Sequence, residues 1–262
     1  MGNLLHDIKK VPKNKKLIVF DLDGTLVESK QDIDEEMAWL LQQLLKEKQV
    51  AVIGGGKYEL FQKQLISGLN SNEELLKKLF LFPANSTLFY RYYNNGWEKV
   101  YSHDLTHEEK AKIFDAFDQV FTKLNYILPE KIYGEVIEDR GTQITFSAIG
   151  QEAPLELKNK WKEDNQDTKL KIIEMLQKLL PDMDVKSAGL TSIDVNQKGM
   201  DKEFGIKQIQ EQLGVSIQDM IFVGNDFSLG SNDSSVIKSG ILYFEVKSVE
   251  ETKKLIRHLI EN

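Results

Sequence analysis

The sequence predicts an α/β protein in which a parallel-sheet domain is interrupted by an inserted α+β domain. Near both ends of the 262-residue chain, short apolar runs alternate with amphipathic helical stretches, as in β-α-β units. The middle of the chain instead mixes hairpin signals with helices, which is typical of an antiparallel sheet covered by helices. We therefore expect a discontinuous core domain, residues 1–86 and 196–262, and an inserted cap domain, residues 87–195.

The first part of the chain supplies three strand candidates, each an apolar run of four residues. They are Leu17–Phe20, Val50–Ile53 and Leu79–Phe82. A helix is expected after Asp34, which can cap it, because the apolar residues that follow repeat at helical spacing. They are Met37, Leu40, Leu41, Leu44 and Leu45. A second helix is expected within GGGKYELFQKQL.

The middle of the chain opens with two aromatic runs around Asn94-Asn95-Gly96, which favours a hairpin. Helices are expected at 110–123 and, after a polar loop, at 169–180. The segments YGEVIE and TQITFSA are strand candidates. From Thr191 the alternation returns: KEFGIKQIQEQL is an amphipathic helix, MIFVG and ILYFEV are buried strands, and SVEETKKLIRHLI is a closing helix.

Composition argues against several classes of function. The net charge of −7 disfavours a nucleic-acid binder, and no apolar run approaches the roughly 20 residues that cross a bilayer. The absence of cysteine excludes disulfides and thiolate metal sites. The N-terminus lacks the apolar stretch of a secretory signal. We therefore expect a cytoplasmic protein that acts on a small molecule, with no nucleic-acid or membrane partner.

The string FDLDGTL places two carboxylates, Asp21 and Asp23, directly after the first buried strand. In an open parallel sheet, ligands bind beyond the carboxyl ends of the strands. Two like charges there repel each other unless a cation or a shared proton compensates. Mg²⁺ suits the pair because it takes oxygen ligands and recruits phosphate oxygens. A turn with two solvated acids is the alternative, and we rank it below the functional interpretation.

Three other segments become informative beside this pair. VGNDFSLGSND follows the strand MIFVG and offers Asn225, Asp226, Asn232 and Asp233 as further oxygen ligands, although alone it is an ordinary loop. Gly54–Gly56 follows the second strand, where backbone N–H groups at a helix N-terminus can bind an anion. Lys202 precedes a helix and can supply the positive charge that a phosphate site needs.

These segments, in this order, resemble the haloacid dehalogenase (HAD) superfamily, whose members are mostly phosphatases and phosphomutases. The inserted domain is similar in size and position to that of the type IIB, C2-capped branch. Within that branch the resemblance is to the eukaryotic-type phosphomannomutase family, over nearly the whole chain. It is carried by EDRGTQITFSAIGQ, TSIDVNQKGMDK and FVGNDFSLGSND. The resemblance implies a Rossmann-like parallel-sheet core with a C2-type α+β cap.

The resemblance also implies roles for the matching residues. Asp21 matches the nucleophile that forms an aspartyl-phosphate, and Asp23 matches the general acid/base. Lys202 matches the lysine that neutralises the transferring phosphoryl group. The implied Mg²⁺ ligands are Asp21, the backbone carbonyl of Asp23 and Asn225, and Asp233 is implied to order the waters on the ion. Asp226 is the alternative to Asn225, because a small shift of the loop would bring its carboxylate to the ion. The implied substrate-binding residues are Gly55, Gly56, Lys30, Arg140, Ser192 and Asp194.

The chain departs from the family at both phosphate sites. The family presents a Ser or Thr hydroxyl where this chain has Gly54–Gly56, and usually an Asp where it has Asn225. The mutase clamp for the distal phosphate uses several arginines, because their forked donors fit phosphate. At the matching positions this chain has Lys30, Tyr133, Arg140 and Gln151.

Three functions therefore stay open, in this order. The first is a Mg²⁺-dependent HAD-type phosphatase that hydrolyses a small phosphorylated, sugar-like metabolite through an aspartyl-phosphate. The second is a phosphomannomutase-type sugar phosphate mutase with an altered clamp. The third is a non-catalytic HAD homologue that binds a phosphorylated metabolite, which the retention of Asp21, Asp23 and Lys202 argues against. A homodimer formed through the cap also stays open.

Overall fold

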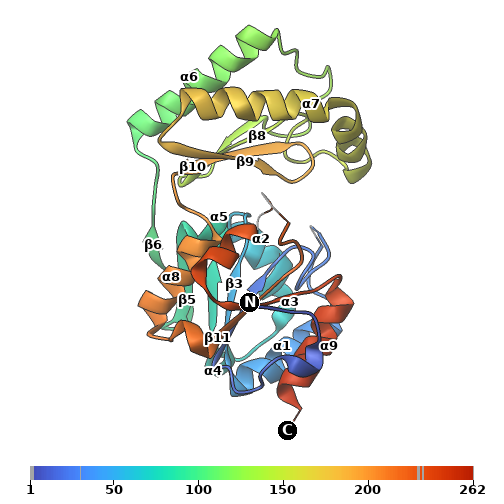
Figure 1. The fold of residues 1–262 in the computed structure, drawn as a ribbon, viewed down its shortest axis with the longest axis vertical. Coiled ribbons are helices and arrows are strands. Elements are labelled where there is room, and N and C mark those ends of the chain that lie inside the picture. The colour runs from blue at the N-terminus through green and yellow to red at the C-terminus, as the bar shows by residue number, and fades with distance from the viewer. Residues whose placement is uncertain (1–2, 30, 229–230, 232, 262) are drawn as a thin grey trace. The chain divides into compact units, whose positions relative to one another are not determined.

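The computed structural model describes residues 3–29, 31–228, 231 and 233–261, which form two compact units. The core domain comprises Met1–Ser102 and Asp201–Asn262, and the cap domain comprises His103–Met200 (Figure 1). In the described residues the core sheet has the strand order β1-β12-β11-β2-β3-β4-β5-β6, and the cap sheet the order β7-β8-β10-β9. The predicted fold class, an α/β core with a separate antiparallel sheet, is confirmed.

The core sheet is parallel from β1 to β4, and β5 and β6 extend it as an antiparallel edge. Its strands are β1 (Leu4–Leu5), β2 (Leu17–Asp21), β3 (Gln49–Ile53), β4 (Leu79–Phe82), β5 (Leu88–Tyr93), β6 (Gly96–Ser102), β11 (Met220–Gly224) and β12 (Leu242–Glu245). Its α-helices are α1 (Glu35–Glu47), α2 (Tyr58–Phe61), α3 (Ser67–Leu69), α4 (Glu73–Leu76), α5 (Pro83–Ser86), α8 (Lys202–Leu213) and α9 (Val249–Ile260). A π-helical turn, Gln62–Ile66, joins α2 to α3.

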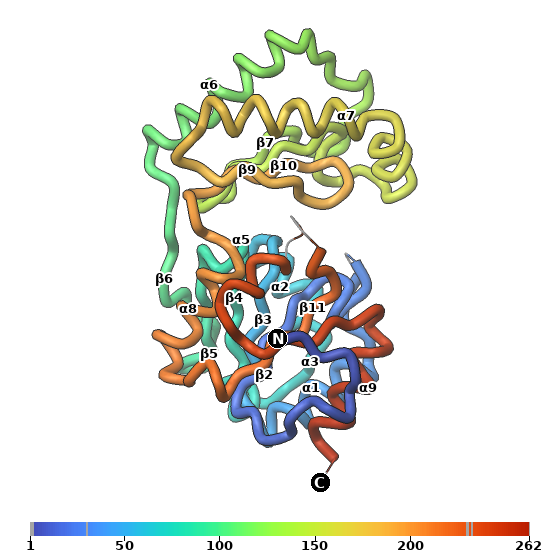
Figure 2. Tube along the Cα trace, in the orientation of Figure 1, coloured from blue at the N-terminus to red at the C-terminus, as the bar shows by residue number. Residues whose placement is uncertain are grey.

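Helices cover both faces of this sheet, which explains why β2 reads as a continuous apolar run. Successive side chains of a strand point to opposite faces. Ile18 and Phe20 accordingly pack in one apolar cluster with α1 and α9, and Leu17 and Val19 pack in another with α8. In the trace of Figure 2, the blue N-terminal and orange-red C-terminal segments lie together in the core domain. No helix of the described residues combines the length and the apolar character that a membrane span requires.

The expected domain boundary at residue 86 is wrong. The aromatic hairpin forms as predicted, with Asn94 and Asn95 in its turn at positive φ, but β5 pairs with β4 in the core sheet. The reason is packing: Phe89 is buried, and its ring stacks on that of Phe82 with centroids 4.5 Å apart. The cap also ends later than expected, at Met200, because β10 runs through residue 195.

The cap domain packs two long helices on a four-stranded antiparallel sheet. Its strands are β7 (Ile137–Asp139), β8 (Gln143–Ser147), β9 (Met183–Ala188) and β10 (Ser192–Gln197), and its helices are α6 (His107–Leu124) and α7 (Leu155–Leu179). Phe117 of α6 and Ile172 of α7 join Phe146 and Ile193 of the sheet in one apolar cluster. Helix α7 begins 14 residues before the expected position, because its first half is polar and gave little helical periodicity.

Candidate active site

Asp21 is the last residue of β2, a strand that lies between β11 and β3. Its side chain is buried, and a tight turn follows at once. The Leu22 carbonyl accepts from the N–H groups of Leu26 (3.0 Å) and Val27 (3.1 Å), and Gly24 adopts a φ of +78° within the turn. The turn sets the half-buried Asp23 beside Asp21 at the carboxyl edge of the sheet, as the sequence predicts.

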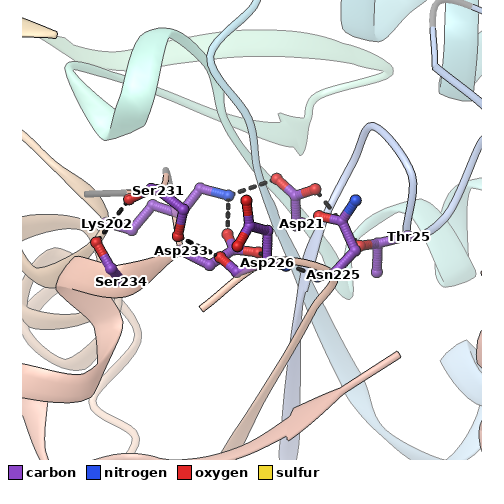
Figure 3. A network of polar contacts seen from close by, with 8 residues as sticks. All are labelled: Asp21, Thr25, Lys202, Asn225, Asp226, Ser231, Asp233 and Ser234. Atoms are coloured by element: carbon purple, nitrogen blue, oxygen red, sulfur yellow. Dashed lines mark hydrogen bonds and ion pairs between the residues drawn. The ribbon is translucent and has the colours of Figure 1, made fainter. Parts of the chain in front are cut away.

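Lys202 joins this edge from the far end of the chain. It is the first residue of α8, whose N-terminus is capped by the carboxylate of Asp201. The Lys202 side chain is completely buried, and its Nζ donates hydrogen bonds to Oδ1 of Asp21 and to Oδ1 of Asp233 (Figure 3). The ammonium group also lies 5.6 Å from the centre of the Phe222 ring. One buried cation is thus shared by two carboxylates.

Burial governs the protonation of this cluster. Loss of hydration raises the pKa of Asp21 to about 7, and the nearby Lys202 ammonium only partly opposes the rise. For Lys202 burial favours the neutral amine, but Asp21 and Asp233 outweigh it, so the pKa of Lys202 is raised. The lysine is therefore charged at neutral pH, and Asp21 ionises close to neutrality.

The loop after β11 completes the cluster. Oδ2 of Asp233 accepts from the backbone N–H groups of Asn225 (3.1 Å) and Asp226 (3.3 Å). A Cβ atom on Gly224 would stand 2.4 Å from that oxygen, so the approach requires glycine. The Asn225 amide lies against Gly24, where an added Cβ would meet Nδ2 at 2.3 Å. Two loops from neighbouring strands therefore interlock beside Asp21.

The donor set fits a hard divalent cation. In the described part of the chain, no three His, Cys, Asp or Glu side chains gather in a way that could hold a metal ion. What does converge is two carboxylates, Asp21 and Asp233, and the side-chain amide of Asn225, and oxygen donors of these kinds suit Mg²⁺. The Asp226 carboxylate instead accepts from the backbone N–H (3.0 Å) and the hydroxyl of Ser228.

The glycine segment after β3, Gly54–Gly56, has backbone N–H donors near the carboxyl edge of the core sheet. The Gly54 N–H donates to the Phe82 carbonyl at 3.3 Å, whereas no backbone hydrogen bond from the Gly55 or Gly56 N–H occurs among the described residues. The segment leads into the helical stretch 58–69. Within it the π-helical turn carries the buried Gln64, whose Nε2 donates to the Gln31 carbonyl (3.2 Å) and lies 3.5 Å from Oδ1 of Asp23. Sequence reasoning missed Gln64, because no motif marks it.

The cap residues form a second polar cluster, within the cap domain. Nε of Arg140 donates to Glu138 at 2.7 Å, and its Nη2 lies 3.4 Å from Oε1 of Gln151. Asp194 is buried on β10, where its Oδ1 accepts from Thr145 at 2.8 Å, and burial raises its pKa. Ser192 is half-buried two residues earlier on the same strand. Lys30, the remaining predicted cap-side contact, lies outside the described residues, as does the candidate ligand Asn232.

Two buried lysines of α7 were not predicted as part of the cap's polar cluster: Lys158 lies where a polar loop was expected, and Lys169 begins the expected helix. Nζ of Lys158 donates to the backbone carbonyl of Gln151 at 2.8 Å. Nζ of Lys169 donates to the Gly189 carbonyl at 2.9 Å. Burial lowers the pKa of Lys169 to about 8, although the negative charge of Asp194 opposes the shift. The cap therefore has more cationic groups near its polar residues than its arginines alone provide.

Comparison with known proteins adds sequence relatives. A family model described as "Eukaryotic phosphomannomutase" matches residues 37–262. The chain is 28% identical over 229 residues to "Phosphomannomutase 1" of Homo sapiens, covering 86% of this chain and 84% of that protein. It is 27% identical over 237 residues to "Phosphomannomutase" of Encephalitozoon cuniculi, covering 85% of this chain and 84% of that protein.

Solved structures share the fold. An IMP-nucleotidase of Plasmodium falciparum superposes with a TM-score of 0.69 at 17% identity, over 96% of this chain and 70% of that one. A trehalose-6-phosphate phosphatase of Aspergillus fumigatus superposes with a TM-score of 0.57 at 15% identity, over 94% of this chain and 93% of that one. At these identities the likeness concerns architecture.

Proposed function

Because the chain belongs to the eukaryotic phosphomannomutase family, within the HAD superfamily, we propose that it transfers a phosphoryl group between two positions of a hexose phosphate through an aspartyl-phosphate on Asp21. The observation that carries the proposal is the Lys202 ammonium shared by Asp21 and Asp233 at the carboxyl edge of the core sheet. The family supports the mutase above hydrolysis, which reverses the order that we expected from the sequence. The enzyme is in either case an HAD-type phosphatase or phosphotransferase.

In the proposed reaction an oxygen of Asp21 attacks one phosphorus of a hexose bisphosphate as the bond from that phosphorus to the sugar oxygen breaks, which leaves a hexose monophosphate beside the aspartyl-phosphate. Asp23 donates a proton to the leaving sugar oxygen. It then takes the proton of the acceptor hydroxyl, whose oxygen attacks the aspartyl-phosphate and releases Asp21. Lys202 offsets negative charge on the phosphoryl oxygens, and its burial strengthens that effect because water is excluded.

Asp21, the Asp23 carbonyl and Asn225 would hold Mg²⁺, with Asp233 beside them. The bound ion supplies positive charge that keeps Asp21 ionised and neutralises phosphate oxygens. The amide of Asn225 offers an oxygen without a negative charge, so the site carries one charge fewer than with an aspartate there. Asp226 is a weaker candidate than we expected, because its carboxylate is engaged with Ser228.

A second candidate is net hydrolysis of the same class of substrate. Hydrolysis is favoured because the Arg140 guanidinium is already paired with Glu138 inside the cap. With Tyr133 and Gln151 at two further clamp positions, the clamp positions themselves offer little uncompensated charge to hold the distal phosphate of the sugar. If the hexose monophosphate leaves while Asp21 carries the phosphoryl group, water attacks the aspartyl-phosphate in place of the sugar hydroxyl. A third candidate, binding without catalysis, is disfavoured by the intact Asp21, Asp23 and Lys202.

Phosphorus NMR tests the proposal directly. Mannose 1-phosphate is incubated with the enzyme, Mg²⁺ and a hexose bisphosphate activator, beside an Asp21→Asn control. Exchange into mannose 6-phosphate with little free phosphate supports the mutase, and steady release of phosphate supports hydrolysis. If neither reaction exceeds the Asp21→Asn control across a panel of sugar phosphates, the proposed function is wrong. The cytoplasmic location and a homodimer through the cap stay predictions.

A further inference from the structure

The segment α5 that follows β4 has the backbone of a loop, because the φ and ψ angles inside it are not those of a right-handed helix. Ala84, Asn85 and Ser86 have φ values of 49°, 55° and 73°, three consecutive residues other than glycine in the left-handed region. All three are buried. Side chains with a Cβ rarely adopt this conformation, and a run of it persists only where its surroundings fix it. The loop is therefore held in place by its neighbours.

Those neighbours belong to the candidate active site. The N–H of Asn85 donates to the Gly54 carbonyl at 2.9 Å, and the N–H of Ala84 donates to the Gly56 carbonyl at 2.8 Å. On its other side Ser86 packs against Gly205, one turn after Lys202 in α8. The loop thus lies between the glycine segment and the helix that carries Lys202.

The side chain of Asn85 is unsatisfied in this position. It is only 8% exposed, and its Oδ1 is buried with no hydrogen-bond partner among the described residues. The amide lies beside Gly55, where an added Cβ would stand 3.6 Å from Oδ1 and 3.8 Å from Nδ2. The side-chain amide carries two N–H donors on its nitrogen and an acceptor on its oxygen. A half-turn about the Cβ–Cγ bond exchanges the positions of the nitrogen and the oxygen. A buried amide oxygen without a partner is costly unless a ligand or a turn of the amide satisfies it.

We propose that Asn85 binds the phosphate of the substrate in the core domain, donating from Nδ2 to a phosphate oxygen held over Gly55 and Gly56. The amide would then replace the hydroxyl that the glycine segment lacks. Its place supports this, since it occupies the space beside Gly55 into which a side chain at that position would extend. The inference rests on the proposed function, because it assigns a ligand to that site.

The test measures binding of inorganic phosphate in the presence of Mg²⁺ by titration calorimetry. Asn85→Gly removes the amide and keeps the left-handed backbone, which glycine adopts without strain. We expect its phosphate affinity to fall by about tenfold or more, the effect of one lost hydrogen bond to a charged group. Asn70→Gly is the matched control, because Asn70 has the same kind of backbone (φ 44°) but is exposed. Its affinity should equal that of wild type.

A second variant separates phosphate binding from a structural role. Gly55 has no positive φ, and among the described residues only the Asn85 amide lies within 4 Å of its would-be Cβ, so serine fits there. Adding Gly55→Ser to Asn85→Gly should restore most of the affinity. Equal affinity in wild type and Asn85→Gly would overturn the inference alone. Wild-type protein that binds no phosphate and forms no aspartyl-phosphate would overturn the proposed function and the inference with it.

Discussion

The Nζ of Lys202 donates a hydrogen bond to Asp21, although 181 positions separate the two residues in the chain. The same ammonium meets Asp233, so one side chain joins the first strand of the site to the loop after β11. All three side chains are buried, and the single ammonium is the counter-charge that the two carboxylates share. Several expected outcomes depend on it.

Replacing Lys202 with methionine leaves two buried carboxylates without their counter-charge. We expect a loss of about 3–5 kcal/mol in the free energy of unfolding at pH 8 without Mg²⁺. Without the cation, the folded-state pKa of Asp21 rises further above its unfolded value. The variant therefore loses stability as the pH rises, and its deficit is smaller at pH 5.5. Urea unfolding at both pH values checks this. Lys198→Met is the control, and a deficit independent of pH would contradict the assignment.

We expect the neighbouring carboxylates to contribute unequally to the affinity for Mg²⁺. Asp21→Ala and Asp233→Ala should each weaken Mg²⁺ binding by at least tenfold in calorimetry, because each removes a buried oxygen donor. Asp226→Ala should change the affinity little, since that carboxylate is engaged with Ser228. Asn225→Asp adds a negative charge beside the ion and should tighten binding. A larger effect from Asp226→Ala than from Asp233→Ala would show that the loop rearranges around the metal.

Gly205 is required by the close approach of α8 to the loop after β4. A Cβ at Gly205 would stand 2.1 Å from Oγ of Ser86 and 2.9 Å from its Cβ. Gly205→Ala should therefore cost about 1–2 kcal/mol, despite the better helix propensity of alanine. Adding Ser86→Gly removes both contacts and suits the φ of 73°, so the double variant should recover the loss. Chemical denaturation measures this; losses that simply add would contradict the packing argument.

The cap clamp is predicted to limit phosphoryl transfer. Glu138→Gln removes the charge that neutralises Arg140, and Tyr133→Arg with Gln151→Arg restores two forked donors. Each change should raise the ratio of mutase exchange to phosphate release, and the arginine pair should raise it by about 10²-fold, if each charged hydrogen bond contributes 1.5–3 kcal/mol. The phosphorus NMR assay reads both products at once. An unchanged ratio would mean that these positions do not hold the distal phosphate.

Lys169 should titrate near pH 8. Its folded-state pKa lies below the ordinary 10.5, so folding disfavours the bound proton, and its contribution to stability improves as the pH rises from 8 towards 10.5. The ε-carbon NMR signal, assigned by its loss in Lys169→Met, should show the midpoint. Asp194→Asn should lower it, because Asp194 is the negative charge that favours the ammonium form. A midpoint above 10 would refute the buried placement.

The local sequence pattern predicts the strand and the motif that build the core site. The sheet that a hairpin joins depends instead on tertiary packing. The strand Leu17–Phe20 and the carboxylates after it were foreseeable, because a buried strand and its following motif are encoded within a few residues. Lys202 lies 181 positions from Asp21, and only the family resemblance assigned it to the site. The hairpin 88–102 was recognised, but alternation does not reveal which sheet a hairpin joins. Its assignment depended on the stacking of Phe89 on Phe82.

The residues missed by sequence reasoning share one property: their environment comes from distant segments. Gln64 reaches Asp23 from a π-helical turn, and periodicity gives no signal for such a turn. Asn85 is marked only by its backbone conformation and by the lack of a partner for its amide. Lys169 lies on the polar-looking part of α7, and its burial depends on the cap sheet.

The order of the segments in the chain has a consequence for biosynthesis. While the ribosome has released only the first 200 residues, β2 lacks its partner β11, and Asp21 lacks both Lys202 and the loop with Asp233. The nascent core thus carries an open hydrogen-bonding edge in the middle of its future sheet while the cap is complete. The last quarter of the chain must dock against a preformed half-sheet, so truncated translation products of this protein are natural clients for chaperones and proteases.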